Sequence, residues 1–196
     1  MRDMILPGRK LTRGYYLQPT LEVAPDLLRK TLVFHYAGGV LAADIVETEA
    51  YIGEGDPACH AAVGRTARND IMYASGGYSY IYFIYGMYYC LNVVTERKGF
   101  PAAVLIRAAE PVVGGEIMAA NSPGKSAYHT NGPGKLCRAF GLTRRENGLD
   151  LTGSQMYIID RQNDPPHIGV STRIGVRNGG DKQWRFFDLD SPYVSR

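Results

Sequence analysis

The sequence predicts an α+β fold: a single domain over residues 1–196, built around a curved antiparallel sheet with short helices at its periphery. Three observations predict it. Strand-like segments follow one another as hairpins, the segments with helical periodicity are few and short, and no linker, repeat or low-complexity block divides the chain. The composition is that of an ordinary globular domain, with 45% hydrophobic and 21% charged residues. A chain of this size buries about 70% of its unfolded surface, so the core needs neither disulfides nor a structural metal.

The first elements are an arm and a helix. Residues 1–14 are expected to form a loose arm. A helix is expected from Thr20, which can cap it, with Glu22 in the first turn and apolar residues at helical spacing behind it. Pro25 is tolerable there if the first turn is short.

Most of the remaining chain consists of segments in which apolar and polar residues alternate, as in β-strands. Residues 37–39 and Gly86 are expected to form hairpin turns. The polar loop 52–69 is long for a compact domain, and such loops are usually functional or disordered. The expected strands are 31–36, 40–51, 78–85, 87–96, 102–110, 156–159, 168–176 and 184–187, with short helices near 112–120 and 135–140.

Cysteine usage and charge limit the class of protein. Cys59, Cys90 and Cys137 are odd in number and form no C-x-x-C pair, which argues against a disulfide framework or zinc ribbon and favours a reducing compartment. No stretch approaches 18 uninterrupted apolar residues and no signal-peptide pattern opens the chain, so we expect neither a membrane protein nor a secreted one. The net charge of +3 permits an anionic partner without demanding one.

Several catalytic motifs are excluded. Gly124, Lys125 and Ser126 end like a phosphate loop, but Ala119 stands where the opening glycine belongs. The chain has no G-x-S-x-G elbow, no H-E-x-x-H pair, and no C-x-x-C downstream of His60 for a zinc deaminase. Any hydrolysis is therefore expected to proceed without a metal.

The strand IVETEAY carries two carboxylates and a phenol. If it is regular, Ile45, Glu47, Glu49 and Tyr51 share one face, with the carboxylate stems roughly 6.6 Å apart. A carboxylate that activates water beside a developing positive charge is suited to hydrolysing a glycosidic bond. The alternative is an edge strand with solvated glutamates.

Half of the 14 tyrosines lie between residues 73 and 89. Alternation places Tyr78, Tyr80 and Tyr82 on one face, and Tyr85 beside Gly86 can protrude from a hairpin tip. Flat aromatic walls suit a nucleobase or sugar ring, and an exposed aromatic at a tip suits wedging into a base stack. The alternative is that most of these tyrosines line the core with their hydroxyls bonded.

Three isolated features carry further predictions: Arg107, residues 132–135 and His60. Arg107 follows an apolar run, so a carboxylate partner is expected. Residues 132–135 (GPGK) open a helix whose free N–H groups, with Lys135, could hold a phosphate, or they are simply a helix start. His60, in the long loop, is either structural or part of a site, whereas Cys59 and Cys90 are interpreted as small core residues.

Together, the segments VETEAYIGEGDPACHA, GRTARND, YIYFIYGMYYCLNVV, VLIRAAEP and NGPGKLCRAFGL resemble the 3-methyladenine DNA glycosylase family of the alkyladenine type, over most of the chain. The resemblance implies a monomeric base-excision repair enzyme. Such an enzyme flips a damaged purine (3-methyladenine, 7-methylguanine, hypoxanthine or ethenoadenine) out of double-stranded DNA and hydrolyses its N-glycosidic bond. It implies neither metal nor cofactor, no lyase activity, and a place in the bacterial cytoplasm at the nucleoid or in a eukaryotic nucleus.

The resemblance also implies roles for five residues around the base. Glu49 would deprotonate the attacking water, and Arg107 would position that water and Glu49. Tyr51 and Tyr82 would sandwich the flipped base, with His60 at the pocket wall.

Four further residues would act on the duplex. Tyr85 would fill the space left by the base, Met87 and Tyr88 would lie in the minor groove, and Asn92 would crowd the 2-amino group of guanine. The chain departs from many relatives at Cys59, where they have serine, and at Tyr88, where many bacterial ones have histidine.

Two rival hypotheses remain. A sugar glycoside hydrolase would use Glu47 and Glu49 as an acid/base pair without dependence on DNA. A non-catalytic DNA-binding module would keep affinity for the duplex and form no product.

Overall fold

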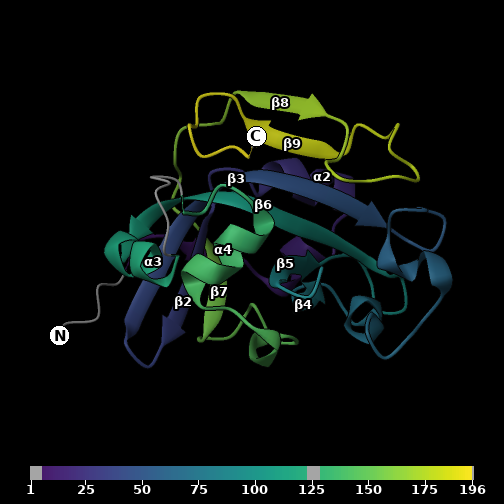
Figure 1. Cartoon of the computed structure of the whole chain (residues 1–196), viewed down its shortest axis with the longest axis horizontal. Helices are drawn as coiled ribbons and strands as arrows, with labels where there is room; N and C mark the ends of the chain where they lie inside the picture. Colours follow the sequence, from purple (N-terminus) through teal and green to yellow (C-terminus); the bar gives the residue numbers. More distant parts are fainter. Residues whose placement is uncertain (1–5, 123–128, 196) are drawn as a thin grey trace.

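One antiparallel sheet organises the chain, and the computed structural model describes residues 6–122 and 129–195 of it. Seven strands are paired in the order β1-β7-β2-β3-β6-β5-β4, and β8 and β9 form a hairpin that joins the sheet through β3 (Figure 1). The strands are β1 (Arg9–Lys10), β2 (Thr31–Tyr36), β3 (Gly39–Ile52), β4 (Ser79–Ile84), β5 (Tyr88–Val94), β6 (Ala102–Val113), β7 (Met156–Asp160), β8 (Ile168–Ser171) and β9 (Arg185–Asp188).

The helices are short and peripheral, as predicted. They are α1 (Arg13–Tyr16), α2 (Thr20–Asp26), α3 (Gly115–Asn121) and α4 (Pro133–Phe140), with 3-10 turns η1 (His60–Val63), η2 (Asp70–Tyr73) and η3 (Arg144–Glu146). The α+β fold is confirmed. Among the helices of the described ranges, none is long and apolar enough to cross a membrane.

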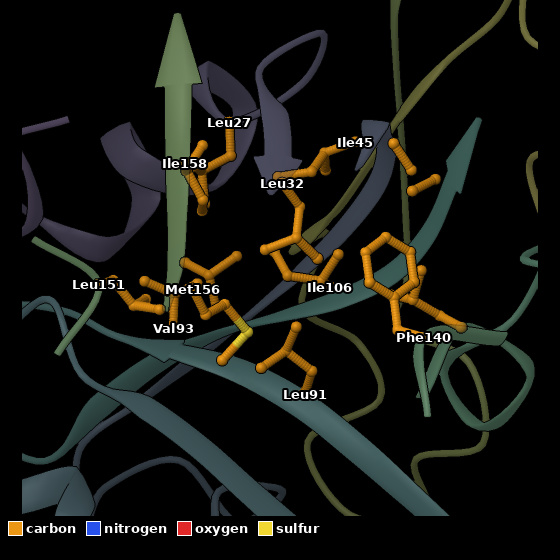
Figure 2. Packing of buried hydrophobic residues seen from close by; sticks show 14 of the residues in the cluster. Leu27, Leu32, Ile45, Leu91, Val93, Ile106, Phe140, Leu151, Met156 and Ile158 are labelled. Atoms are coloured by element: carbon orange, nitrogen blue, oxygen red, sulfur yellow. The ribbon is translucent and has the colours of Figure 1, made fainter. Parts of the chain in front are cut away.

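The main core lies between the sheet and helices α2 and α4. Figure 2 shows Leu27, which directly follows α2, and Phe140 of α4 among strand residues that include Leu32, Ile106 and Ile158. Successive side chains of a strand point to opposite faces of the sheet, so only every second residue of a strand can enter this core. Alternate residues of β4, β5 and β6 enter this core: Ile81, Leu91, Val93, Val104 and Ile106.

The opposite face of β4 to β6 carries a second, smaller cluster. There the loop between β3 and β4 packs Cys59, Ala61 and Met72 against Tyr80 and Ala103. The long loop is therefore ordered against the sheet, and the prediction that Cys59 is a small core residue is confirmed.

The strand IVETEAY contains a bulge that the alternation argument missed. In the register of β3 against β6, Ile45 faces Ala109, Glu47 faces Ala108 and Thr48 faces Ile106. Val46 on β3 and Arg107 on β6 are therefore each an extra residue without a partner in the ladder. Ile45 consequently belongs to the main core, whereas both glutamates contact Arg107 on the other face. The prediction of one face for all four residues was wrong for Ile45.

The expectation for the N-terminal arm was also wrong in part. Arg9 and Lys10 pair with β7, and Arg13 forms an ion pair with Asp150 at 2.7 Å, so the chain is held against the domain well before residue 14. Thr20 begins α2, but Pro19 occupies the cap position. The Thr20 hydroxyl instead donates a hydrogen bond to the Glu96 carboxylate.

Two boundaries near the site differ from prediction as well. Strand β6 continues to Val113, so α3 begins only at Gly115. Strand β8 ends at Ser171 rather than residue 176, because the buried Arg173 turns inward to pair with Asp56 at 2.6 Å. Residues 124–126, excluded above as a phosphate loop, lie outside the described residues.

Candidate active site

A pocket of about 630 Å³ opens on the sheet face opposite the main core. Side chains of β4, β5 and β6 form its floor, with Tyr51 of β3 beside them. The loops before β4 and after β8 form two walls, and the β4–β5 hairpin and the start of α4 form the rim. The floor consists of Tyr80, Tyr82, Cys90, Asn92, Ala103, Leu105 and Arg107, and the walls and rim include Ala58, His60, Met72, Tyr85, Tyr88, residues 132–135 and residues 174–178.

Glu49 lies directly behind two lining residues, Tyr51 and Arg107, with its side chain fully buried. Its Oε2 accepts a hydrogen bond from the Tyr51 hydroxyl (2.8 Å), and its Oε1 accepts one from the backbone N–H of Ile174 (2.7 Å). Nη1 of Arg107 is 3.3 Å from the same Oε1. Three donors from three separate segments therefore hold this carboxylate in one orientation.

Arg107 connects the two glutamates, which confirms that it has a carboxylate partner. Its Nε donates to Glu47 Oε1 at 2.9 Å, and its Nη1 faces Glu49. Burial by itself would lower the pKa of Arg107, but the charges of Glu49 and Glu47 outweigh burial and raise the pKa. The guanidinium is therefore a permanent positive charge in the pocket floor.

Glu47 is enclosed on every side. Its side chain is fully buried and its two oxygens accept hydrogen bonds from Arg107, from Arg185 Nε (2.6 Å), and from the hydroxyl (2.8 Å) and N–H (2.7 Å) of Ser195. Neither glutamate is among the residues that line the pocket. Glu49 nevertheless contacts three lining residues (Tyr51, Arg107 and Ile174), whereas Glu47 contacts only Arg107 among them. The arrangement argues against an acid/base pair of Glu47 and Glu49, because four donors already occupy the oxygens of Glu47.

Tyr51 forms one aromatic wall. The guanidinium of Arg173 lies over its ring, 4.7 Å from the centroid, and burial followed by the charge of Glu49 raises the pKa of Tyr51. Its hydroxyl therefore stays a hydrogen-bond donor to Glu49 at neutral pH. Arg173 is fixed in turn by Asp56; burial would raise the pKa of Asp56, but the hydrogen bond and charge of Arg173 lower it.

Sequence reasoning missed the segment 173–178. Arg173 supports Tyr51, the N–H of Ile174 holds Glu49, and Gly175 and the next three residues line the pocket. The alternation of this stretch had predicted a strand. A signal was present in Gly175, Gly179 and Gly180, which are typical of a loop.

His60, together with Tyr80 and Tyr82 at the adjoining edge of the floor, forms a second aromatic wall. Nδ1 of His60 is 2.7 Å from the Tyr80 hydroxyl, and the His60 ring meets the Tyr82 ring edge-on at 4.4 Å. Burial and the charge of Arg68 lower the pKa of His60 to about 4, so the imidazole is neutral at physiological pH. Tyr80, which had been weighed as a core residue, lines the pocket as well.

The β4–β5 hairpin presents Tyr85 and Met87 to solvent. Both central residues of the turn have positive φ, 55° at Tyr85 and 66° at Gly86, and the N–H of Met87 closes the turn onto Ile84. A tyrosine in this conformation is unusual. Tyr85 is 76% exposed and Met87 61% exposed, next to the pocket mouth.

Tyr88, the first residue of β5, lies against α4. A Cβ added at Gly134 would come within 2.7 Å of the Tyr88 ring, and the Arg138 guanidinium lies 5.5 Å from the ring centroid. Glycine at position 134 therefore permits the helix and the hairpin to touch. Nζ of Lys135, on the same turn of α4, donates to Asn131 at 2.7 Å, so the GPGK segment forms a helix start at the pocket rim.

Asn92 lies in the pocket floor with 3% of its surface exposed. Its Nδ2 donates to the backbone carbonyls of Tyr80 (3.0 Å) and Cys90 (3.4 Å). The amide is thus held rigidly while its side chain lines the cavity. Among the described residues, no group of three or more His, Cys, Asp or Glu side chains could hold a metal ion.

These features define a site for a flat ring, with two aromatic walls and a buried carboxylate–arginine pair at its edge. Comparison with known proteins agrees with that class. The family model described as methylpurine-DNA glycosylase (MPG) matches residues 14–192. The chain therefore belongs to this family.

Curated relatives extend over nearly the whole chain. A protein of Methanocella arvoryzae, named "Putative 3-methyladenine DNA glycosylase", is 51% identical over 191 residues, which cover 95% of this chain and 96% of the relative. Proteins with the same name from Desulfitobacterium hafniense and Sodalis glossinidius are 45% and 46% identical, over 95% and 93% of this chain and 98% of each relative. The predicted resemblance is confirmed.

Proposed function

We propose that this glycosylase flips alkylated or deaminated purines out of double-stranded DNA and hydrolyses their N-glycosidic bond, leaving an abasic site. The proposal depends chiefly on Glu49, a fully buried carboxylate beside Arg107 at the edge of an aromatic pocket. The substrate class is that of 3-methyladenine, 7-methylguanine, hypoxanthine and ethenoadenine. Poor pairing reduces the cost of extruding such a base, and alkylation of the purine ring weakens the glycosidic bond that is hydrolysed.

Glu49 acts as the general base in this proposal. Water attacks C1′ of the sugar, its proton passes to Glu49, and the electron pair of the breaking C1′–N bond leaves with the purine. The sugar becomes positively charged as that bond lengthens, and a nearby carboxylate stabilises this charge. Arg107 holds Glu49 and directs the water, because its guanidinium faces both the pocket and the carboxylate.

The two aromatic walls hold the purine. Tyr51 contacts one face of the base, and Tyr82 with His60 contacts the other. A neutral His60 favours a base that carries a positive charge, as 3-methyladenine and 7-methylguanine do, because an imidazolium would repel it.

The hairpin tip enters the duplex. Tyr85, exposed beside the pocket mouth, fills the space left by the base, and Met87 lies in the minor groove next to it. Tyr88 supports the tip from below through its contact with Gly134. Asn92, held by two backbone carbonyls, crowds the 2-amino group of guanine.

A duplex with a single hypoxanthine tests the proposal. The chain is incubated with the duplex and abasic sites are then cleaved with alkali. Strand cleavage supports the proposal, and binding without cleavage indicates a binding module. If the chain neither binds nor cleaves the duplex, it is not an enzyme that acts on DNA. A parallel incubation with sugar glycosides tests the alternative of a sugar glycoside hydrolase.

Two further measurements define the reaction. Borohydride is expected to trap no covalent adduct. A lyase needs a free amine nucleophile, and the Nζ of Lys135 at the pocket rim is engaged with Asn131 at 2.7 Å. Affinity for DNA is expected to fall linearly in a plot of log Kd against log salt, because several Lys and Arg residues must neutralise phosphates. A flat response would contradict duplex DNA as the substrate.

A further inference from the structure

Ser195 lies behind the pocket, in the segment that follows β9. Its side chain is nearly fully buried, and it does not line the pocket. Its hydroxyl donates to Glu47 Oε1 (2.8 Å) and accepts from Nη2 of Arg107 (3.3 Å), while its N–H donates to Glu47 Oε2 (2.7 Å). One serine therefore contacts both members of the buried ion pair.

The contacts of Arg107 show why this hydroxyl matters. The guanidinium is planar and carries its donors in a rigid fork. Nε is held by Glu47 at 2.9 Å, Nη2 by Ser195 at 3.3 Å, and Nη1 faces Glu49 at 3.3 Å. With two nitrogens held, the direction of the third is determined. With Nε alone held, the plane can tilt and Nη1 can leave Glu49.

Strand β9 fixes the serine in its turn. Arg185 donates to Glu47 through Nε (2.6 Å) and to the backbone carbonyl of Ser195 through Nη2 (3.3 Å). Its Nη1 donates to the hydroxyl of Ser171 on β8 (3.0 Å). The position of Ser195 is thus set by the β8–β9 hairpin rather than by the pocket.

We propose that Ser195 is a positioning residue, which fixes the rotation of the Arg107 guanidinium so that Nη1 faces Glu49. The inference rests on the proposed function, in which Glu49 and Arg107 act on the water. Ser195 itself touches neither base nor sugar.

Ser195→Ala tests the proposal, with Ser195→Thr as the conservative variant and Ser191→Ala as the matched control. Ser191 is a buried serine in the same segment whose hydroxyl bonds Glu110 rather than Arg107. Single-turnover base release from the hypoxanthine duplex, Kd for that duplex and the thermal midpoint are measured for each. Rates are divided by the folded fraction from circular dichroism.

Ser195→Ala is expected to lower the rate about tenfold or more, because small misplacements of a catalytic group are costly. Its Kd is expected to stay within about twofold of the wild-type value. Ser195→Thr, which keeps the hydroxyl, restores most of the rate, and Ser191→Ala has the wild-type rate. If the alanine variant does not fold, Ser195→Cys, similar in shape but a weak hydrogen-bond partner, replaces it and is expected to be slow.

Equal rates for Ser195→Ala and Ser191→Ala would overturn the role of Ser195 and leave the proposed function intact. A threonine variant as slow as alanine, or a rate loss matched by a loss of affinity, would also overturn it. Absence of base release by the wild-type chain would instead refute the proposed function, and the role of Ser195 with it.

Discussion

Glu49→Gln removes one charge at the centre of the site while keeping its shape. The carboxylate accepts hydrogen bonds from Tyr51 and Ile174 and lies 3.3 Å from Arg107. Glutamine retains one acceptor oxygen, and the Tyr51 hydroxyl can accept from the new amide. Because a hydrogen bond to a charged group is worth about 1 kcal/mol more than a neutral one, the two bonds cost about 2 kcal/mol of unfolding free energy.

That cost leaves the variant folded. Ordinary domains have roughly 5–15 kcal/mol of stability, and Arg107 keeps Glu47 at 2.9 Å as a counter-charge. The rate of base release is expected to fall far more, by about a hundredfold or more, because an amide cannot take the proton from water. Single-turnover release of hypoxanthine from a duplex, with Kd measured in parallel, separates the two effects.

Glu54→Gln is the control. Its carboxylate also accepts from a tyrosine hydroxyl at 2.8 Å, that of Tyr73, but it contacts neither Arg107 nor the pocket floor. Its rate is expected to equal that of the wild type. A Glu49→Gln variant that retains more than a tenth of the wild-type rate would refute Glu49 as the base, and Glu47 would then be the next residue to test.

Three other outcomes are expected. Tyr85→Gly raises the thermal midpoint slightly, because the φ of 55° suits glycine, yet lowers base release about tenfold or more; an unchanged rate contradicts the wedge. Between pH 6.5 and 4, the free energy of unfolding falls by up to about 3 kcal/mol, because His60 is protonated in the unfolded chain before it is protonated in the folded chain, where its pKa is about 4. Urea titrations of the wild type and of His60→Gln across this range check this, and an equal dependence of unfolding free energy on pH in both refutes it. Asn92→Ala raises excision of undamaged guanine relative to hypoxanthine, because the crowding group is gone; an unchanged ratio in a folded variant makes Asn92 purely structural.

Much of the site could be predicted because strand geometry is local. Alternation along β4 and β5 placed Tyr80 with Tyr82, and Cys90 with Asn92, on one face. Gly86 marked the hairpin tip where Tyr85 now protrudes. These placements depend only on neighbouring residues and on the two-residue period of a strand.

The difference between the two glutamates could not be predicted in this way. Glu47 and Glu49 are two residues apart on one face, and either could have been the carboxylate that contacts the pocket-lining Tyr51 and Ile174. Arg185 and Ser195, which enclose Glu47, come from the far end of the chain, as does the N–H of Ile174 that holds Glu49. Contacts between such distant segments depend on how β8 and β9 dock on β3, which no local pattern encodes.

The sequence by itself thus determined the fold class, the order of hairpins, the family and the residue types that meet at the site. Tertiary structure alone decided that Val46 is an extra residue in the ladder, which turns Ile45 into the core and separates it from Glu47. It also decided that the segment after β8 forms a pocket wall. The physical reason is range: alternation and turn chemistry act over a few residues, whereas buried ion pairs and strand register are set by packing across the whole sheet.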